Sequence, residues 1–161
     1  MFVWPSRGAF LLAFSKESEN NQRIDKQHAI KRSIMSQRPV VVGLLVCEQA
    51  VIEANSNNVS LINCFTRLKV ERFPSEPRRF TVFAALIDGF GNIALDVVIY
   101  RLDTREEIYH QSRMALFQDR LQEVRFLFRV TQCAFPVSGK YEIVLQADGQ
   151  ALANHLISVV A

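Results

Sequence analysis

The sequence predicts one antiparallel β-sandwich over residues 38–161, and three observations support this fold class. Segments of about five to ten residues either alternate apolar and polar side chains or are apolar throughout, as strands do. Clusters of Asn, Asp, Gly and Pro separate these segments, as in turns. No segment repeats its apolar residues at the period of a helix, so we expect an all-β domain of about eight strands.

The first half of this region predicts three strands. Pro39–Glu48 is nearly continuously apolar, which indicates a strand buried on both faces. The polar turn Asn55–Asn58 leads into Val59–Phe73, whose alternation predicts one strand with one buried face. Phe80–Ile87 is apolar at odd and even positions alike, so we expect an inner strand there.

The second half predicts five strands connected by short turns. They span Ile93–Leu102, Ile108–Phe117, Glu123–Thr131, Lys140–Ala147 and Gln150–Val160. The first and the fourth each predict an inward face, made of Ile93, Leu95, Val97 and Ile99 and of Tyr141, Ile143, Leu145 and Ala147. The third of these alternates most clearly, with Val124, Phe126, Phe128 and Val130 predicted to face inward and Arg125 and Arg129 outward. Asp148 and Gly149 form a strong hairpin signal between the last two strands. Such short connections favour antiparallel pairing.

Residues 1–37 differ from the rest and are expected to form a disordered or loosely helical tail. The apolar core Ala9–Phe14 is too short for a signal peptide, and no small-residue cleavage site follows it. Ser15–Lys31 is polar and charged, with too few apolar positions to bury a helix face.

The end of this tail also suggests where translation starts. The codons of residues 31–35 can spell a purine-rich ribosome-binding sequence, AGGAG, a few nucleotides before the AUG of Met35. One hypothesis is therefore that translation starts at Met35 and that residues 1–34 are not translated. The other is that residues 1–34 form a genuine basic, flexible arm.

The distribution of charge argues against nucleic acid as a partner. The formal net charge is +3, and residues 1–35 carry six basic and three acidic side chains. Residues 36–161 therefore hold the remaining 13 basic and 13 acidic side chains and are neutral. A neutral domain lacks the field that attracts a phosphate backbone. No apolar run approaches 18 residues, so we expect no membrane-spanning helix and no membrane partner.

The three cysteines, Cys47, Cys64 and Cys133, match no metal-ligand spacing. Each lies in or beside an apolar run, where a free thiol behaves as a small hydrophobic side chain. An odd number of such cysteines favours a reducing compartment, so we expect a cytoplasmic protein. Cys47 and Cys64 fall on adjacent predicted strands, and whether they approach closely enough to pair is left open.

No catalytic, cofactor-binding or metal site is expected from the motifs. His110 and His155 lie in the middle of strands, without a neighbouring metal-ligand or catalytic motif. The carboxylates around Asp103 surround a β-turn beside Arg105, which is typical of a solvated hairpin tip. No glycine-rich phosphate loop and no nucleophile elbow occur.

A few side chains do not fit the inward face of their strand and suggest a protein-contact surface. Phe65 shares the polar face of its strand, and Phe90 occupies a hairpin tip. Leu127 lies between two outward-facing arginines. Exposed aromatic and apolar side chains often mark contact sites. The candidate surface consists of Phe65, Phe90, Arg125, Leu127 and Arg129.

Five stretches carry a resemblance to a known family. They are Val41–Glu48, Leu61–Phe65, Arg72–Pro74, Phe83–Gly89 and Cys133–Tyr141. In these stretches the chain resembles a bacterial family of small, uncharacterised domains, whose members begin near the position of Met35. The resemblance implies no activity, cofactor or catalytic residue. The closing segment, from Pro136 through the Asp148–Gly149 turn to the last strand, is similar to the final hairpin of immunoglobulin-like domains.

These observations lead to two functional hypotheses. The first is a non-catalytic cytoplasmic module that binds a protein partner or a second copy through a sheet face or edge. The second is a small-ligand binder or an enzyme whose site is assembled from dispersed residues near His110 and His155. The second hypothesis requires the two histidines to converge in the folded chain.

Overall fold

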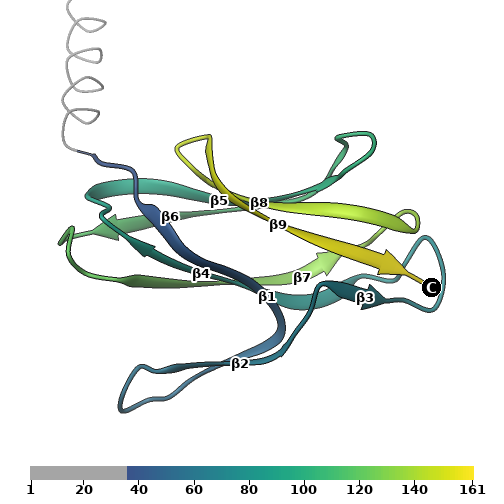
Figure 1. Cartoon of the computed structure of the whole chain (residues 1–161), viewed down its shortest axis with the longest axis horizontal. Coiled ribbons are helices and arrows are strands. Elements are labelled where there is room, and N and C mark those ends of the chain that lie inside the picture. Colours follow the sequence, from purple (N-terminus) through teal and green to yellow (C-terminus); the bar gives the residue numbers. More distant parts are fainter. Residues whose placement is uncertain (1–35) are drawn as a thin grey trace, which may run out of the picture. The chain divides into compact units, whose positions relative to one another are not determined.

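A computed structural model describes residues 36–161 of the chain, and these residues form two β-sheets (Figure 1). The compact unit runs from Gln37 to Ala161. Gln37 exchanges two backbone hydrogen bonds with Phe90, of 2.8 and 2.9 Å, so the ordered domain includes the last residue of the expected tail. The other expectations for the tail, including a start at Met35, concern residues outside the described range.

The first sheet contains four strands in the order β2–β1–β4–β7. Their bounds are Val59–Cys64 for β2, Val40–Ile52 for β1, Arg78–Ile87 for β4 and Val124–Cys133 for β7. All neighbouring strands in this sheet are antiparallel. The strands β2 and β7 are therefore its two edges.

The second sheet contains five strands in the order β3–β9–β8–β5–β6. Their bounds are Arg67–Lys69 for β3, Gln150–Val160 for β9, Gly139–Ala147 for β8, Gly91–Arg101 for β5 and Glu107–Phe117 for β6. The short β3 runs parallel to β9, and the other pairs are antiparallel. The orders β1–β4–β7 and β9–β8–β5 match strands A, B, E and G, F, C of an immunoglobulin domain. The predicted immunoglobulin-like β-sandwich is confirmed.

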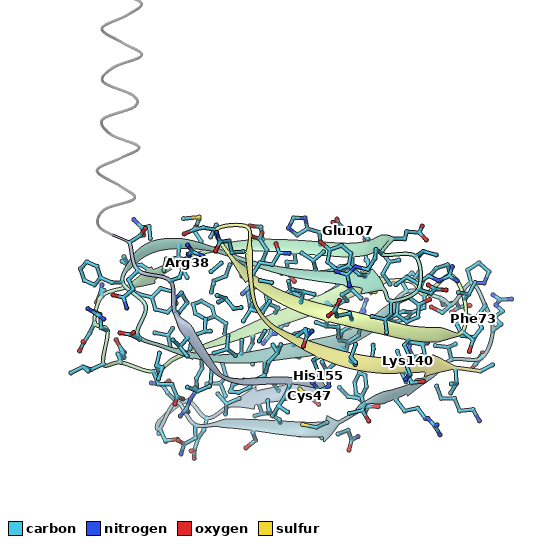
Figure 2. All side chains as sticks on the ribbon, turned by 45° about the horizontal axis from the view of Figure 1, so that its top comes forward. Arg38, Cys47, Phe73, Glu107, Lys140 and His155 are labelled. Atoms are coloured by element: carbon cyan, nitrogen blue, oxygen red, sulfur yellow. The ribbon has the colours of Figure 1, made fainter. Side chains whose placement is uncertain are left out.

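The core lies between the two sheets and is built from every second side chain of the central strands (Figure 2). The inward side chains of β5 and β8 that the alternation predicted are buried to 0% exposure: Ile93, Leu95, Val97, Ile99, Tyr141, Ile143, Leu145 and Ala147. The inward set predicted for β7 also packs in this core, with Phe128 and Val130 fully enclosed and Val124 and Phe126 partly so. The period of two therefore identified the inward face of these strands correctly.

A buried tyrosine anchors the start of β8. The hydroxyl of Tyr141 donates a 2.7 Å hydrogen bond to the carbonyl oxygen of Val137, four residues upstream. Its ring packs edge-to-face against Phe135, with centroids 4.9 Å apart. A tyrosine near this position that bonds back to the upstream backbone is a hallmark of immunoglobulin-like sandwiches. The turn after β8 has positive φ at Asp148 and Gly149, 48° and 77°, as the predicted two-residue hairpin requires.

The strand predicted over Val59–Phe73 is instead two strands in different sheets, which raises the number of strands to nine within residues 36–161. The chain leaves the first sheet after Cys64 and joins the second at Arg67. Asn63, with φ of 54°, breaks the extended backbone just before this crossing. Ile62 is consequently exposed, whereas Leu68 is buried, although the alternation placed both on one buried face.

The first strand was predicted to be buried on both faces, and this prediction is wrong. The strand β1 is longer than expected, and on one face Val40 and Leu45 are 52% and 41% exposed. Its second half, from Gln49 to Ile52, pairs with β2 but not with β4. Figure 1 shows this β1–β2 hairpin extending beyond the other strands of its sheet.

Candidate functional site

The outer face of the first sheet has an apolar centre. Leu45 of β1 lies directly opposite Phe83 of β4, which lies directly opposite Leu127 of β7. The residue next to each of these in sequence points into the core, so these three side chains point away from it. The register adds three more side chains to the same side. We call the set the outer apolar face: Val40, Leu45, Phe83, Ala85, Ile87 and Leu127.

Much of this surface is open to solvent. Val40 and Leu45 are exposed, and Phe83, Ile87 and Leu127 are half-buried. Val42, at a β-bulge in β1, is 51% exposed beside them. Antiparallel sandwiches ordinarily carry polar side chains on their outward positions. An apolar outward set spanning three neighbouring strands is therefore the feature of this sheet that its own core does not explain.

Arginines border the outer apolar face along β7. Arg125 and Arg129 lie two residues before and after Leu127 and project to the same side of the sheet. Arg125 forms an ion pair with Glu123, with 2.6 Å between Nε and Oε1. Arg79 lies on β4, just before the buried Phe80. Neither Arg79 nor Arg129 makes an ion pair within residues 36–161.

A fourth arginine covers the free edge of β7. Arg113 lies on β6, the facing edge strand of the second sheet. Its Nη1 donates a 3.4 Å hydrogen bond to the carbonyl oxygen of Leu127, and its guanidinium carbon lies 5.8 Å from the centroid of the Phe128 ring. A charged side chain placed against an edge strand in this way discourages pairing with a further strand. The face of the first sheet is therefore more accessible to a partner than its β7 edge.

The five residues of the predicted contact surface do not all lie together. Arg125, Leu127 and Arg129 share the outer side of β7, as predicted. Phe65 does not lie with them, because it is half-buried and its ring packs edge-to-face on Phe80, with centroids 6.1 Å apart. Phe90 is 38% exposed, but it lies in the β4–β5 turn, where its backbone pairs with Gln37.

Two cysteines lie beside the outer apolar face. Cys47 of β1 and Cys64 of β2 are directly opposite each other, and both are free thiols. Cys47 is buried, and Cys64 is exposed. Burial, and to a smaller extent the nearby Cys64, raises the pKa of the Cys47 thiol. The third cysteine, Cys133, lies in the core, where burial raises its pKa to about 12.

The outer face of the second sheet combines paired polar side chains with apolar side chains at its two sides. Glu142 accepts hydrogen bonds from the guanidinium of Arg105 and from Nδ2 of Asn154, the latter at 2.6 Å. The bond from Arg105 holds the pKa of the Glu142 carboxyl below its ordinary value. Beneath these side chains, the outward Val98 and Val144 are only 2% and 5% exposed. The middle of this face is thus covered, whereas Met114 and Leu116 on β6 and Leu156 on β9 are 69%, 57% and 49% exposed.

The two strand histidines do not converge. His110 lies opposite Val98 on the outer face, where its Nε2 is 3.0 Å from Asp96. His155 lies on β9 opposite the buried Ile143, and two strands, β8 and β5, separate β9 from β6. The Nε2 atom of His155 is buried without a hydrogen-bond partner among the described residues. The site expected near His110 and His155 is therefore not assembled, because the histidines lie on opposite faces of the sheet.

Comparison with known families identifies the chain. The model of a family of unknown function, DUF6941, matches residues 43–160. The chain belongs to the DUF6941 family. This match spans both sheets, so the DUF6941 domain corresponds to the whole sandwich except the start of β1. No curated protein sequence matches the chain at a significant level.

Solved structures similar to the DUF6941 chain are distant in sequence. An immunoglobulin-like protein from Pseudomonas aeruginosa is 12% identical, with a TM-score of 0.37 over 77% of this chain and 98% of its own. A β-glucosidase from Listeria innocua, in complex with isofagomine, is 10% identical, with a TM-score of 0.38. That match covers 75% of this chain but only 16% of the glucosidase.

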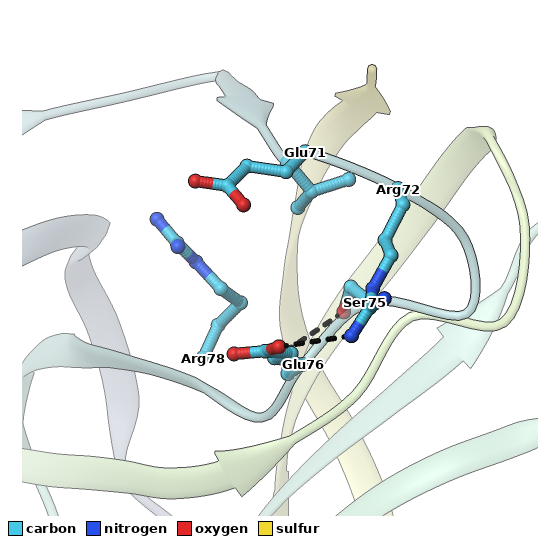
Figure 3. A pocket seen from close by; sticks show the side chains of 6 residues that line it. Glu71, Arg72, Ser75, Glu76 and Arg78 are labelled. Atoms are coloured by element: carbon cyan, nitrogen blue, oxygen red, sulfur yellow. Dashed lines mark hydrogen bonds and ion pairs between the residues drawn. The ribbon is translucent and has the colours of Figure 1, made fainter.

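Two hollows are lined by residues within 36–161, and each is bordered by charged side chains of opposite sign. One hollow of about 90 Å³ is lined by the β3–β4 loop, where Glu71 and Arg78 point toward each other (Figure 3). Ser75 holds this loop through a 2.9 Å bond from the Phe135 amide. A second, of about 340 Å³, lies over the Arg105–Glu142 pair. Ligand pockets generally measure about 300–1,000 Å³ and present unpaired polar groups.

Neither a metal cluster nor a membrane span is evident in the part of the chain that the structure describes. No group of three or more His, Cys, Asp or Glu side chains is placed there to hold a metal ion. No helix in this part is long and apolar enough to cross a membrane.

Sequence reasoning missed most of the outer apolar face. Leu45 and Phe83 lie in segments that are apolar at every position, and such segments are typical of strands covered on both sides. The alternation of β7 did show that Leu127 points outward. Because Phe83 pairs with Leu127, the outward position of Leu127 could have indicated that Phe83 points outward as well. Strand order within the sheet was needed to place the three side chains in one row.

Proposed function

We propose that this DUF6941 domain is a non-catalytic, cytoplasmic protein-binding module and that it binds its partner with the outer apolar face. The observation that carries the proposal is the row of Leu45, Phe83 and Leu127 across three neighbouring strands, which no core requires. On the second sheet, the outward valines are buried, and the exposed apolar side chains Met114, Leu116 and Leu156 lie on β6 and β9, which two strands separate, so they form no continuous row. Exposed apolar patches with a polar border commonly mark protein-contact sites.

The border of the face supports binding to a protein. Protein interfaces typically have an apolar centre enriched in aromatic side chains and arginine. Phe83 supplies the aromatic side chain of the centre, and Arg125 and Arg129 lie at its margin. The shared three-strand surface is nearly flat, as sheet faces are, and suits an extended surface of a partner more than a small molecule.

A capture experiment with matched variants tests the proposal. The full chain is immobilised, incubated with extract of its own cells, and bound proteins are identified by mass spectrometry. The matched variants are Leu45→Asp, on the outer apolar face, and Met114→Asp, which places the same charge on the outer side of the second sheet at a 69% exposed position.

A partner captured by the wild type and by Met114→Asp, but reduced about a hundredfold by Leu45→Asp, supports the proposal. Equal capture by both variants, or capture of no specific protein by any of them, contradicts it. Light scattering of the same samples shows whether the bound partner is a second copy of the chain.

A further inference from the structure

From the charge at its border, we infer that the partner of the outer apolar face presents an acidic, apolar segment, with carboxylates on either side of an apolar side chain. This inference rests on the proposed function and specifies the chemistry of the partner. It follows from three properties of the described residues: the sign of the charges at the border, their spacing, and the lack of carboxylates to neutralise them.

The border charges are nearly all positive. Arg79, Arg125 and Arg129 project on the outer side of β4 and β7, and Glu123 is the carboxylate that lies with them. Glu123 already accepts the Nε–H of Arg125 at 2.6 Å. Arg129 and Arg79 have no carboxylate within ion-pair distance among residues 36–161. The surface therefore offers guanidinium groups that residues 36–161 leave without a charged partner.

Elsewhere among the described residues, some basic side chains are paired with carboxylates and others, such as Arg67 and Lys140, are not. Arg72 with Glu76, Arg101 with Asp103, and Arg120 with Asp88 form ion pairs of 3.1, 2.7 and 3.0 Å. The border of the outer apolar face differs in that its unpaired arginines stand beside exposed apolar side chains. The domain as a whole is neutral, so the positive border does not reflect a general excess of basic residues. Guanidinium groups bind carboxylates in a bidentate geometry, which makes acidic side chains their matching partners.

The spacing along β7 sets the arrangement of the partner's side chains. Arg125, Leu127 and Arg129 occupy alternate positions, so their Cα atoms follow one another at intervals of about 6.7 Å. An extended segment that carries a carboxylate, an apolar residue and a carboxylate at alternate positions has the same spacing. Its apolar side chain would meet Leu127 and Phe83, one carboxylate would meet Arg129, and the other would share Arg125 with Glu123.

A second copy of this chain does not supply that chemistry. In a two-fold contact the same surface is used on both sides, so the arginine border would face another outer apolar face. The carboxylate of that face is Glu123, which is already paired with Arg125. A different protein that carries unpaired carboxylates fits the border better.

Peptide selection tests this inference without knowledge of the partner. A random peptide library displayed on phage is panned against the immobilised full chain and against three variants. These are the charge reversal Arg125→Glu with Arg129→Glu, the apolar-face variant Leu45→Asp, and a control reversal, Arg67→Glu with Lys140→Glu. The control residues are exposed on the second sheet, so they match the change of charge without touching the outer apolar face.

We expect wild-type chain and control reversal to enrich peptides with excess Asp and Glu around apolar residues. The reversal on β7 should abolish this acidic excess, and a peptide selected on wild type should bind it at least about tenfold more weakly in fluorescence anisotropy. Its affinity for wild type should also fall as salt is raised.

The outcomes separate this inference from the proposed function. If the enriched peptides depend on Leu45 but carry no acidic excess, the inference of an acidic partner is wrong and the proposed apolar contact is still supported. The same holds if the enrichment is unchanged by the β7 reversal. Enrichment insensitive to both variants contradicts the proposed function as well. Sedimentation of the chain with phosphatidylserine vesicles, lost in the β7 reversal, would assign the same arginines to an anionic membrane and overturn the inference.

Discussion

The two outer faces of this sandwich cover a common core but present different chemistry to solvent. On the second sheet, Arg105 and Asn154 both bond to Glu142, Val98 and Val144 are almost fully buried, and the exposed apolar side chains Met114, Leu116 and Leu156 lie apart on β6 and β9. On the first sheet, Leu45, Phe83 and Leu127 point outward, and arginines stand at their margin without such a network. The contrast shows that packing between the sheets determines only the side chains on the inward face of each strand. The side chains on the outward face are not constrained by the core and can be used for binding.

The largest expected effect distinguishes the two sides of one strand. Val46→Asp places a charge at a position that is 1% exposed, whereas Leu45→Asp places it at a neighbour that is 41% exposed. We expect Val46→Asp to lower the free energy of unfolding by at least about 4 kcal/mol, because a buried charge lacks a partner. Leu45→Asp should cost under about 1 kcal/mol.

Urea denaturation followed by circular dichroism measures both variants. Equal destabilisation of the two would show that Leu45 belongs to the core and would remove it from the outer apolar face. A destabilisation confined to Val46→Asp would confirm that the outer face is not needed for folding.

The next effect concerns the two thiols beside the outer apolar face. With glutathione disulfide as oxidant, Cys47 and Cys64 should form a disulfide, the two thiols giving up two hydrogens as two molecules of glutathione are released. Residues directly opposite on antiparallel strands have a Cα separation that a disulfide accepts. The bond closes a loop of 17 residues and should stabilise the fold by about 3 kcal/mol.

Intact mass and urea denaturation of the oxidised chain measure this effect, and Cys64→Ser should abolish it. Labelling with a maleimide at neutral pH should modify Cys64 first, because it is the exposed thiol. Cys133 should react last, because it is buried and its pKa is about 12. Rapid labelling of Cys133 would contradict the packing of β7 against the core.

A smaller effect is expected at the edge that Arg113 covers. Arg113→Ala removes the 3.4 Å bond to the Leu127 carbonyl oxygen and the cover over the Phe128 ring. We expect a loss of about 1 kcal/mol in the free energy of unfolding and more self-association, because the β7 edge becomes available for pairing. Sedimentation velocity at increasing protein concentration measures the association, with Arg129→Ala as the control. Association of the control to the same degree would indicate that the sheet face, and not the edge, drives it.

The smallest effect is expected on the polar outer face. The pKa of Glu142 is lowered in the folded chain, chiefly by Arg105, so this carboxylate stabilises the fold above its unfolded-state pKa. That contribution is lost as the pH falls through the folded-state pKa. Glu142→Gln should therefore cost under about 1 kcal/mol at neutral pH, since Arg105 is largely exposed.

Denaturation of wild type and Glu142→Gln across the acid range measures the difference between them. The difference should shrink as the pH falls below about 4, the usual range for a carboxyl group. A difference that persists unchanged in strong acid would show that packing, and not the ion pair, is responsible.

Local patterns predicted the strands whose two faces differ. In β7, the alternation of phenylalanine and arginine identified the inward and outward sides, and in β8 every predicted inward residue is fully buried. The Asp148–Gly149 turn was also predicted, since its positive φ values suit those residue types. Each of these features depends on residues that are close together in the chain.

Predictions failed where strand pairing decides the outcome. The change of sheet at Phe65 and Thr66 leaves the period of two uninterrupted in the sequence, so one long strand was expected. Phe65 consequently appeared to be outward, although its ring packs on Phe80. The separation of His110 and His155 also depends on strand order, because β8 and β5 intervene between their strands.

The sequence by itself determined that this domain is an antiparallel sandwich, which residues of β5, β7 and β8 face inward, and that its charges balance. These properties follow from composition and from a side-chain period of two, which act over a few residues. Only the tertiary structure decided that Leu45, Phe83 and Leu127 form one exposed row and that Cys47 faces Cys64. Such neighbours come from distant parts of the chain, and it is the register between strands that brings them together.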